Sequence, residues 1–347
     1  MRILDVVPHR VFPVIGGSHK RIHLINLAMS QRGHKVILAA MHPGYLWGSF
    51  DDLHKLKFLS FNRNYGYVEF LHPVNLCLTS LRLSPPVLLS GISLSMLKPP
   101  LLSKGFLRRF DVIKVEYPWI FKQVYGNKPS NVPIILVEHN VESYLYAQLM
   151  RERKRHTVLP FRFKLYANLC YKIEKHALER ADAIFVTSRR DALILKELFD
   201  LHATKIVVIP NCVNIEEFEN KDGVRDKVRR ELGINEKCAI LFSGSDYIPN
   251  HRAVRFIIKL AKNFRREKVV FLIAGSVGER YRHLTLPNVI FTGKVIDVVP
   301  YFLAADIAIN PIDLGSGVNV KMLEYFAAGL PVITTAVGAR GIEGLIN

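Results

Sequence analysis

The sequence predicts an α/β protein of two doubly wound domains, each a parallel sheet with helices on both faces. Short runs rich in Val, Ile and Leu alternate with helical patterns along the chain, which is typical of strands buried on both faces. A polar, charged segment at 210–237 interrupts this alternation, which then restarts. The chain of 347 residues is also too long for one ordinary core and fits two domains.

The first half of the chain contains six predicted strands, at residues 2–8, 35–41, 111–117, 133–140, 183–188 and 205–210. Residues 70–110 fit the pattern less well, because their apolar runs are mixed with prolines and end in basic residues. Two interpretations stay open for this segment. It forms either one or two interfacial helices with an apolar face and cationic flanks, or core helices broken by prolines.

The second half contains five predicted strands, at residues 239–245, 269–276, 288–293, 307–311 and 331–335. We place the boundary near residue 212, which gives domains 1–212 and 213–347. Ligands of doubly wound sheets bind at the carboxyl ends of the strands. A cleft between the two domains is therefore the expected site.

The chain is strongly basic, with 48 Lys and Arg against 30 Asp and Glu and a net charge of +18. Such a surplus attracts nucleic acid, anionic membranes or phosphorylated ligands, and composition alone does not choose among them. Residues 151–172 hold seven Lys or Arg against one acid. This run is either a solvated helix face or part of an interaction surface.

Several classes of protein are excluded by missing motifs. The four cysteines lie far apart without a C-x-x-C pair, which argues against a zinc site and favours a reducing compartment. The first residues do not resemble a signal peptide, and no apolar stretch is long enough to span a membrane. There is also no P-loop, G-x-S-x-G, H-E-x-x-H or D-x-D motif. We therefore expect a cytoplasmic protein without a bound metal.

Two glycines follow the first strand where a helix is expected to begin. Gly16 and Gly17 would let backbone N–H groups approach a phosphate or a sugar at the positive end of that helix. Glycine pairs are also common in turns for geometric reasons alone.

A second glycine turn, at Gly315 and Gly317, carries more chemistry. A helix is expected to begin near Asn319 and to end at Gly329, before a proline. A helix N-terminus, a glycine approach and the lysine at 321 together suit a diphosphate.

The helical period places Lys321 and Glu324 on one side, facing the cleft, and Leu323, Phe326 and Ala327 on the other. A carboxylate such as that of Glu324 can accept two hydrogen bonds from the vicinal hydroxyls of a ribose. The alternative is an ordinary i,i+3 surface ion pair.

The stretch GSGVNVKMLEYFAAGLPVITTAVGARGI (315–342) resembles the C-terminal motif of the family 4 retaining glycosyltransferases. Further similar segments are VEHNVES (137–143), ADAIFVTSRRDA (181–192), VIPNCVNIEEF (208–218) and LFSGSDYIPNHRAV (241–254). The resemblance implies GT-B architecture, with two Rossmann-like domains facing a central cleft. The first domain would bind the acceptor and the second the nucleotide-sugar donor.

The resemblance also implies an activity. The chain would transfer a sugar from a nucleotide diphosphate sugar to an acceptor hydroxyl, with retention of configuration and without a metal or other cofactor. We expect a glycan or lipid-linked acceptor in the synthesis of cell-surface polysaccharide or glycolipid. The basic segments would hold the enzyme on an anionic membrane surface, at its inner face.

The family motif assigns roles to individual residues. Lys321 would bind phosphate, Glu324 the ribose, and His139 would lie near the transferred sugar, although a histidine at a strand end is often only a capping donor. These three are the expected catalytic residues. The expected substrate-binding residues are Gly16, Gly17, Asn140, Gly244, Ser245, Asn250, Arg252, Gly315, Ser316, Gly317, Val318 and Asn319.

The sequence departs from the family pattern in three places. Ser316 stands where many members have a glutamate eight positions before Glu324, and a serine cannot supply that negative charge. Only His251 and Arg252 are available where many members carry an Arg and a Lys for the diphosphate. Members also usually continue past residue 347, so we expect the second domain to lack the usual C-terminal helices.

Two other functions remain open at the level of sequence. One is a GT-B protein without transferase activity, such as a regulatory subunit or a nucleotide-sugar epimerase. The net charge of +18 also suggests nucleic-acid binding. No helix-turn-helix signature and no interleaving of aromatic and basic residues supports this, so we expect no nucleic-acid partner.

Overall fold

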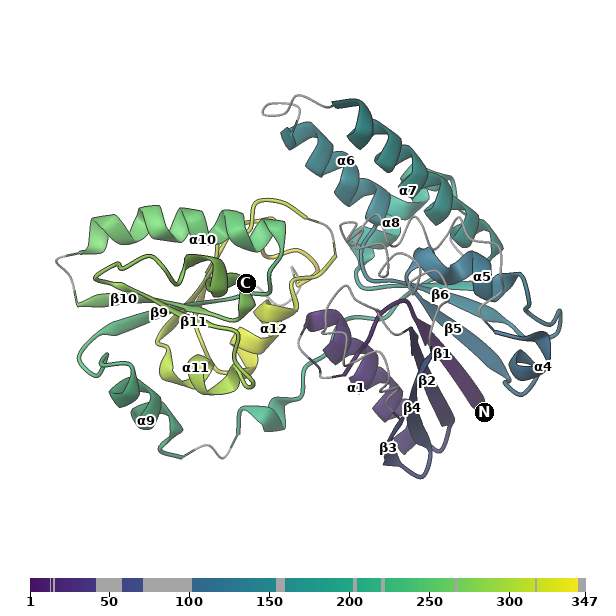
Figure 1. Cartoon of the computed structure of the whole chain (residues 1–347), viewed down its shortest axis with the longest axis horizontal. Coiled ribbons are helices and arrows are strands. Elements are labelled where there is room, and N and C mark those ends of the chain that lie inside the picture. The colour runs from purple at the N-terminus through teal and green to yellow at the C-terminus, as the bar shows by residue number, and fades with distance from the viewer. Residues whose placement is uncertain are drawn as a thin grey trace. The chain divides into compact units, whose positions relative to one another are not determined.

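The computed structural model describes residues 1–12, 14, 16–41, 58–70, 102–153, 160–201, 205–219, 222–265, 268–315 and 317–342. The chain divides into two compact units, Met1–Pro210 and Asn211–Asn347. Each unit is a sheet of mainly parallel strands covered by helices, so the predicted fold class is confirmed (Figure 1).

The first unit contains an eight-stranded sheet in the order β3-β4-β2-β1-β5-β6-β7-β8. All pairs are parallel except β3 with β4, which form an antiparallel hairpin at one edge. The six predicted strands are present and the hairpin was not predicted. The bounds are β1 Arg2–Val7, β2 Lys35–Met41, β3 Phe58–Asn62, β4 Tyr65–Phe70, β5 Val112–Glu116, β6 Ile134–Glu138, β7 Ala183–Val186 and β8 Ile206–Val208.

Helices cover both faces of this sheet, because alternate side chains of each strand point to opposite faces. Ile3 of β1 lies in one apolar cluster with Ile22 of α1. Leu4, on the opposite face, shares a cluster with Leu178 of α7 and Leu195 of α8. The helices are α1 Gly17–Gln31, α4 Lys104–Leu107, α5 Phe121–Tyr125, α6 Glu142–Arg153, α7 Pro160–Arg180 and α8 Arg189–Phe199, with a 3₁₀ turn at Pro118–Ile120.

The two segments expected at a membrane are only partly described. Residues 71–101 of the segment 70–110 lie outside the described residues, and α4 follows them. The basic segment 151–172 covers the end of α6 and the first part of α7. None of the helices in the described part of the chain has the length and apolarity needed to cross a membrane.

The second unit contains a parallel five-stranded sheet in the order β11-β10-β9-β12-β13. Its strands, β9 Cys238–Ser243, β10 Val269–Ala274, β11 Val289–Gly293, β12 Ile307–Asn310 and β13 Val332–Thr334, match the five predicted ones. Figure 1 shows helix α10 (Ile248–Ala261) on one side of the sheet, with α11 (Val299–Ala304) and α12 (Val320–Ala327) on the other. Accordingly Phe242 of β9 packs with α10, whereas its neighbour Leu241 packs with α11 and α12.

The strand order reverses once in each sheet. In the first unit β1 lies between β2 and β5, and in the second β9 lies between β10 and β12. Ligands of open α/β sheets bind beyond the carboxyl ends of the strands at such switch points. The loops after β1, β5, β9 and β12 are therefore where the structure favours binding.

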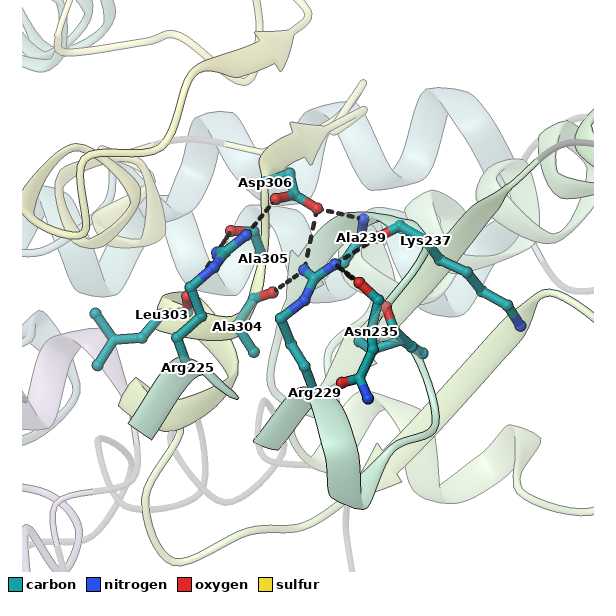
Figure 2. A network of polar contacts seen from close by, with 10 residues as sticks. Arg225, Arg229, Asn235, Lys237, Ala239, Leu303, Ala304, Ala305 and Asp306 are labelled. Atoms are coloured by element: carbon teal, nitrogen blue, oxygen red, sulfur yellow. Dashed lines mark hydrogen bonds and ion pairs between the residues drawn. The ribbon is translucent and has the colours of Figure 1, made fainter. Parts of the chain in front are cut away.

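Helix α9 (Val224–Glu231) is tied to the second unit by two arginines (Figure 2). The Arg229 guanidinium is buried, and it lies 3.1 Å from Asp306 Oδ2. It also donates to the backbone carbonyls of Ala304, Ile234, Asn235 and Lys237. Arg225, whose side chain is 44% exposed, contacts the other Asp306 oxygen at 2.5 Å and the carbonyls of Leu303 and Ala305.

Candidate functional site

Lys321 lies in the first turn of α12, as the sequence predicted. Its ammonium group donates to Asn250 Oδ1 at 2.8 Å and lies 4.1 Å from the centre of the Phe242 ring. Burial lowers the pKa of this group from 10.5 to about 7, and the carboxylate of Glu324 opposes the shift. Asn250 and Phe242 carry no negative charge to offset this burial, so the charged form of the lysine is disfavoured.

Asn250 connects α10 to the loop that follows β9. Its Nδ2 donates to the carbonyl of Ser245 at 2.9 Å while its Oδ1 accepts from Lys321, so both ends of the amide are used. A Cβ on Gly244 would lie 2.9 Å from the Asn250 side chain, and one on Gly275 would lie 2.5 Å from Gly244 O. This turn accepts only glycine, and the expected residues Gly244, Ser245, Asn250 and Lys321 come together there.

Arg252 and His251, the other polar residues of this segment, have protein partners. Arg252 forms a two-point ion pair with Asp313, with Nε 3.0 Å from Oδ1 and Nη2 2.5 Å from Oδ2. His251 contacts Asp246 Oδ1 at 2.5 Å and the Tyr281 hydroxyl at 3.1 Å. Arg252 thus joins α10 to the loop after β12, a pairing that the sequence did not reveal.

The glycine turn before α12 has the geometry that requires glycine. Gly315 and Gly317 have φ angles of +138° and +71°. The buried side chain of Arg340 donates to the carbonyl of Gly315, so the turn is held from the loop after β13. The sequence prediction missed Arg340, although it lies in the family motif. Ser316 lies outside the described residues.

Helix α12 begins and ends close to the predicted positions and packs its apolar side chains against the second sheet. Asn319 is its N-cap residue and Gly329 follows its end, with φ +71°. Met322 and Tyr325 are buried, whereas Phe326, expected on the side opposite Lys321 and Glu324, is 38% exposed. Tyr325 also accepts a hydrogen bond from Ser243 N at 2.9 Å, which needs it inside.

Two further predicted residues of this segment serve the turn itself. The Asn319 side chain donates to the carbonyl of Gly338 at 3.0 Å. Val318 packs against Gly341, where an added Cβ would meet its side chain. Their side chains therefore shape the loop rather than project from it.

In the first unit, the expected glycines begin helix α1. Gly16 is the N-cap residue and Gly17 the first helical residue. A Cβ on Gly16 would meet nothing within 4 Å, and its φ of −143° suits any residue. Unlike Gly244, Gly16 therefore has no folding requirement for glycine in this structure.

His139 lies just beyond β6 and is buried. Its Nε2 lies 2.6 Å from Glu116 Oε2, and Lys114 Nζ lies 2.8 Å from Glu116 Oε1 and 2.9 Å from Asp5 Oδ2. Burial alone would raise the pKa of Glu116, but Lys114 and His139 outweigh it and hold that pKa well below its usual 4.5. The sequence contains a signal for this cluster that the prediction missed. Lys and Glu seldom lie inside a buried strand without a partner, and Lys114 and Glu116 both lie in one.

A row of imidazole and phenol rings leads from His139, just beyond β6, to residues that follow β5 and β1. The Tyr117 ring stacks on the His139 ring, with 4.4 Å between the ring centres. The centre of the His9 ring lies 5.3 Å from that of Tyr117 and 5.1 Å from that of His19. Burial lowers the pKa of His9 to about 3 and that of His19 to about 4, with neighbouring histidines adding to both shifts. Both rings are therefore neutral near pH 7.

Asn140 and the start of α6 adjoin a group of buried carboxylates. Asn140 donates to Glu142 Oε1 at 3.3 Å, and Glu174 of α7 accepts from the backbone N–H groups of Glu142 and Ser143. Burial and repulsion by Glu174 raise the pKa of Glu142 to about 8. Asn140 thus has a structural contact in addition to its expected role.

The comparison with protein families decides where the chain belongs. The model described as Glycosyltransferase Family 4 matches residues 15–217, more than half of the chain. The chain belongs to glycosyltransferase family 4. A second model, Glycosyl transferases group 1, matches residues 237–346. No curated protein matches the sequence closely enough to count as a relative.

Solved structures share the fold of this family 4 chain at low sequence identity. Anabaena Alr3699/HepE in complex with UDP-glucose has 15% identity and a TM-score of 0.65, covering all of this chain and 83% of its own. WaaG, a glycosyltransferase involved in lipopolysaccharide biosynthesis, has 17% identity and a TM-score of 0.59 over 99% of this chain and 83% of its own. The catalytic domain of starch synthase IV from Arabidopsis thaliana, bound to ADP and acarbose, has 13% identity and a TM-score of 0.63 over 96% and 82%. These likenesses confirm the GT-B fold.

Proposed function

We propose that this glycosyltransferase moves a sugar from a nucleotide diphosphate sugar to an acceptor hydroxyl with retention of configuration. The observation that carries the proposal is the setting of Lys321, at the switch point of the second sheet. An amide and an aromatic ring hold its ammonium beside turns that admit only glycine. The complexes of the Anabaena protein with UDP-glucose and of the Arabidopsis enzyme with ADP support a nucleotide donor.

A diphosphate would place negative charge beside the buried amine of Lys321. Because burial lowers its pKa to about 7, an anionic ligand beside it would restore the ammonium form. Negative charge grows on the departing phosphate as the sugar bond breaks, so the lysine would stabilise the transition state more than the bound donor. Loss of one such positioned donor typically raises the barrier by about 2.7–4 kcal/mol.

The remaining roles in the donor site follow the family motif. Glu324, one turn after Lys321, would bind the ribose hydroxyls, and Gly17 with Gly16 would lie near the diphosphate. His139 would contact the transferred sugar. The departing phosphate oxygen would take the proton of the acceptor, so the proposed reaction uses neither a separate general base nor a metal ion.

The proposed acceptor is a glycan or a lipid-linked sugar in the synthesis of a surface polysaccharide or glycolipid. The net charge of +18 and the basic run at 151–172 would hold the enzyme on an anionic membrane from the cytoplasmic side. Basic residues near such a surface contribute about 1 kcal/mol each. Sedimentation with anionic vesicles at low salt tests the proposed membrane binding, and a protein that stays in the supernatant would contradict it.

The donor assignment is tested by calorimetric titration with UDP, GDP, ADP and their sugars. A ligand at 100 times its Kd also adds about 2.7 kcal/mol to stability, so a thermal-shift panel serves as a first screen. Lys321→Met should abolish or strongly weaken binding. Lys259→Met, which removes an exposed charge from α10, is the matched control and should bind like the wild type.

Three results would contradict the proposal at different points. If no nucleotide binds and Lys321→Met behaves like Lys259→Met, the donor site is wrong. If a donor binds but anomeric NMR shows an inverted product, retention is wrong. If activity is lost in EDTA and returns with a divalent ion, the metal-free reaction is wrong.

A further inference from the structure

A buried chain of polar contacts begins at His139 and ends at Asn26 of α1. His139 Nε2 lies 2.6 Å from Glu116, Glu116 lies 2.8 Å from Lys114 Nζ, and Lys114 lies 2.9 Å from Asp5. Asn26 of α1 closes the chain, with its Nδ2 2.6 Å from Asp5 and its Oδ1 3.3 Å from Lys114. All five side chains are at most 7% exposed. Nothing in the family motif used above assigns a role to Glu116.

The contact with Glu116 fixes where His139 carries a proton. An ionised carboxylate can only accept hydrogen bonds, so Nε2 must be the protonated nitrogen at 2.6 Å. Lys114 keeps Glu116 ionised by contacting its second oxygen. In the neutral ring the lone pair is then left on Nδ1, which has no hydrogen-bond partner among the described residues.

The plane of the His139 ring is fixed by Tyr117, the residue after Glu116. Tyr117 stacks on the imidazole with 24° between the ring planes. Its φ of +73° is rare for a residue other than glycine and costs about 1–3 kcal/mol. Two consecutive residues therefore hold His139: Glu116, the last residue of β5, at the ring edge, and Tyr117, which follows it, at the ring face.

We propose that Glu116 is a positioning residue that holds His139 in its Nε2–H form, so that Nδ1 accepts a hydrogen bond from a hydroxyl of the transferred sugar. This inference rests on the proposed function for the sugar, but the placement of the proton does not. A carboxylate that orients a histidine in this way usually fixes its tautomer. The opposite tautomer would present an N–H group to the sugar and change which hydroxyl geometry is accepted.

The first measurement is the ¹⁵N NMR spectrum of histidine-labelled protein, with His139 assigned by its loss in His139→Gln. The wild type should show the Nε2–H form. Glu116→Gln should show a mixture of tautomers, because an amide can turn either its oxygen or its NH₂ group toward the ring. Asp5→Asn makes the same chemical change at the other carboxylate of Lys114 and should leave the His139 signals unchanged.

The second measurement is steady-state kinetics with the donor sugar that the calorimetric titration identifies. Glu116→Gln should lower kcat by about 10- to 100-fold, as for other carboxylates that orient a functional histidine. Its donor KM should stay within about twofold, and Asp5→Asn should match the wild type in both.

The outcomes distinguish the positioning role of Glu116 from the proposed transferase function. An Nδ1–H form in the wild type, or an unchanged tautomer in Glu116→Gln, overturns the positioning role whether or not the protein is active. Equal kinetic losses in Asp5→Asn and Glu116→Gln also overturn it, because they point to general packing. If the tautomers behave as expected but the wild type transfers no sugar from any donor, the proposed function fails and the positioning of His139 stands.

Discussion

Replacement of Arg229 by methionine should destabilise the second unit without affecting the first. Methionine keeps the apolar stem of the side chain and removes the guanidinium, which contacts Asp306 and four backbone carbonyls (Figure 2). A hydrogen bond from a charged donor contributes about 1.5–3 kcal/mol. Asp306 keeps Arg225 and the N–H of Ala239 as partners.

The expected loss is therefore smaller than the sum of five such bonds. Disruption of a fully buried ion pair costs about 3–5 kcal/mol, and because the Asp306 side chain is 30% exposed we expect Arg229→Met to fall at the lower end of this range. That is a large part of the ~5–15 kcal/mol typical of a folded domain. Arg225→Met is the matched control, since Arg225 shares the helix and the carboxylate but is 44% exposed. Exposed pairs contribute about 0–1 kcal/mol.

Urea unfolding with pulsed hydrogen exchange and mass spectrometry can follow peptides from β9 and β12. Tryptophan fluorescence provides an internal control, because both tryptophans, Trp47 and Trp119, precede residue 210. Its midpoint should be the same in the wild type and both variants. A loss below about 1 kcal/mol for Arg229→Met, or equal losses in the two variants, would refute the argument from burial.

Three further predictions follow from the pKa shifts and the glycine contacts. At pH 8 the amine of Lys321, with a pKa near 7, is mostly neutral, so binding of a nucleotide diphosphate should take up close to one proton. Calorimetry in two buffers of different ionisation enthalpy measures this uptake, and Lys321→Met should remove it. The folded-state pKa of Glu142 is raised to about 8, so its contribution to stability is present below pH 4.5 and is lost as the pH rises through 8. Glu142→Gln should therefore be more stable than the wild type at pH 9 by tryptophan fluorescence, and a less stable variant would contradict this. Gly275→Ala should cost about 1–3 kcal/mol, because its φ is +99° and its Cβ would lie 2.5 Å from Gly244 O. Gly16→Ala should leave the melting temperature unchanged, since nothing lies within 4 Å of its Cβ.

The fold was largely predictable because parallel strands buried on both faces leave continuous apolar runs in the sequence. All eleven predicted strands are present. The β3–β4 hairpin was missed because its strands, FLSFN and YGYVEF, lie at an edge and mix polar with aromatic residues. Its signal was the short polar turn between two aromatic runs, which is weaker than a buried strand.

The candidate site was predictable in its residue types and not in its pairings. Lys321 and Asn250 are 71 positions apart, and only the folded sheet brings them to 2.8 Å. The same is true of Arg252 with Asp313, 61 positions apart. Glu116 was missed because it lies within a predicted strand, and the apolar pattern of a strand does not reveal the polar partners of a charged residue.

The arginines of α9 also bear on where the second unit can be separated from the rest of the chain. The family model for this half begins at residue 237, after α9 has ended at Glu231. A polypeptide that starts there would lack Arg225 and Arg229, and the Asp306 carboxylate would face the loop carbonyls without a cation between them. A start before Val224 retains both side chains. The compact unit, Asn211–Asn347, is thus longer at its amino end than the stretch of sequence that matches the family model.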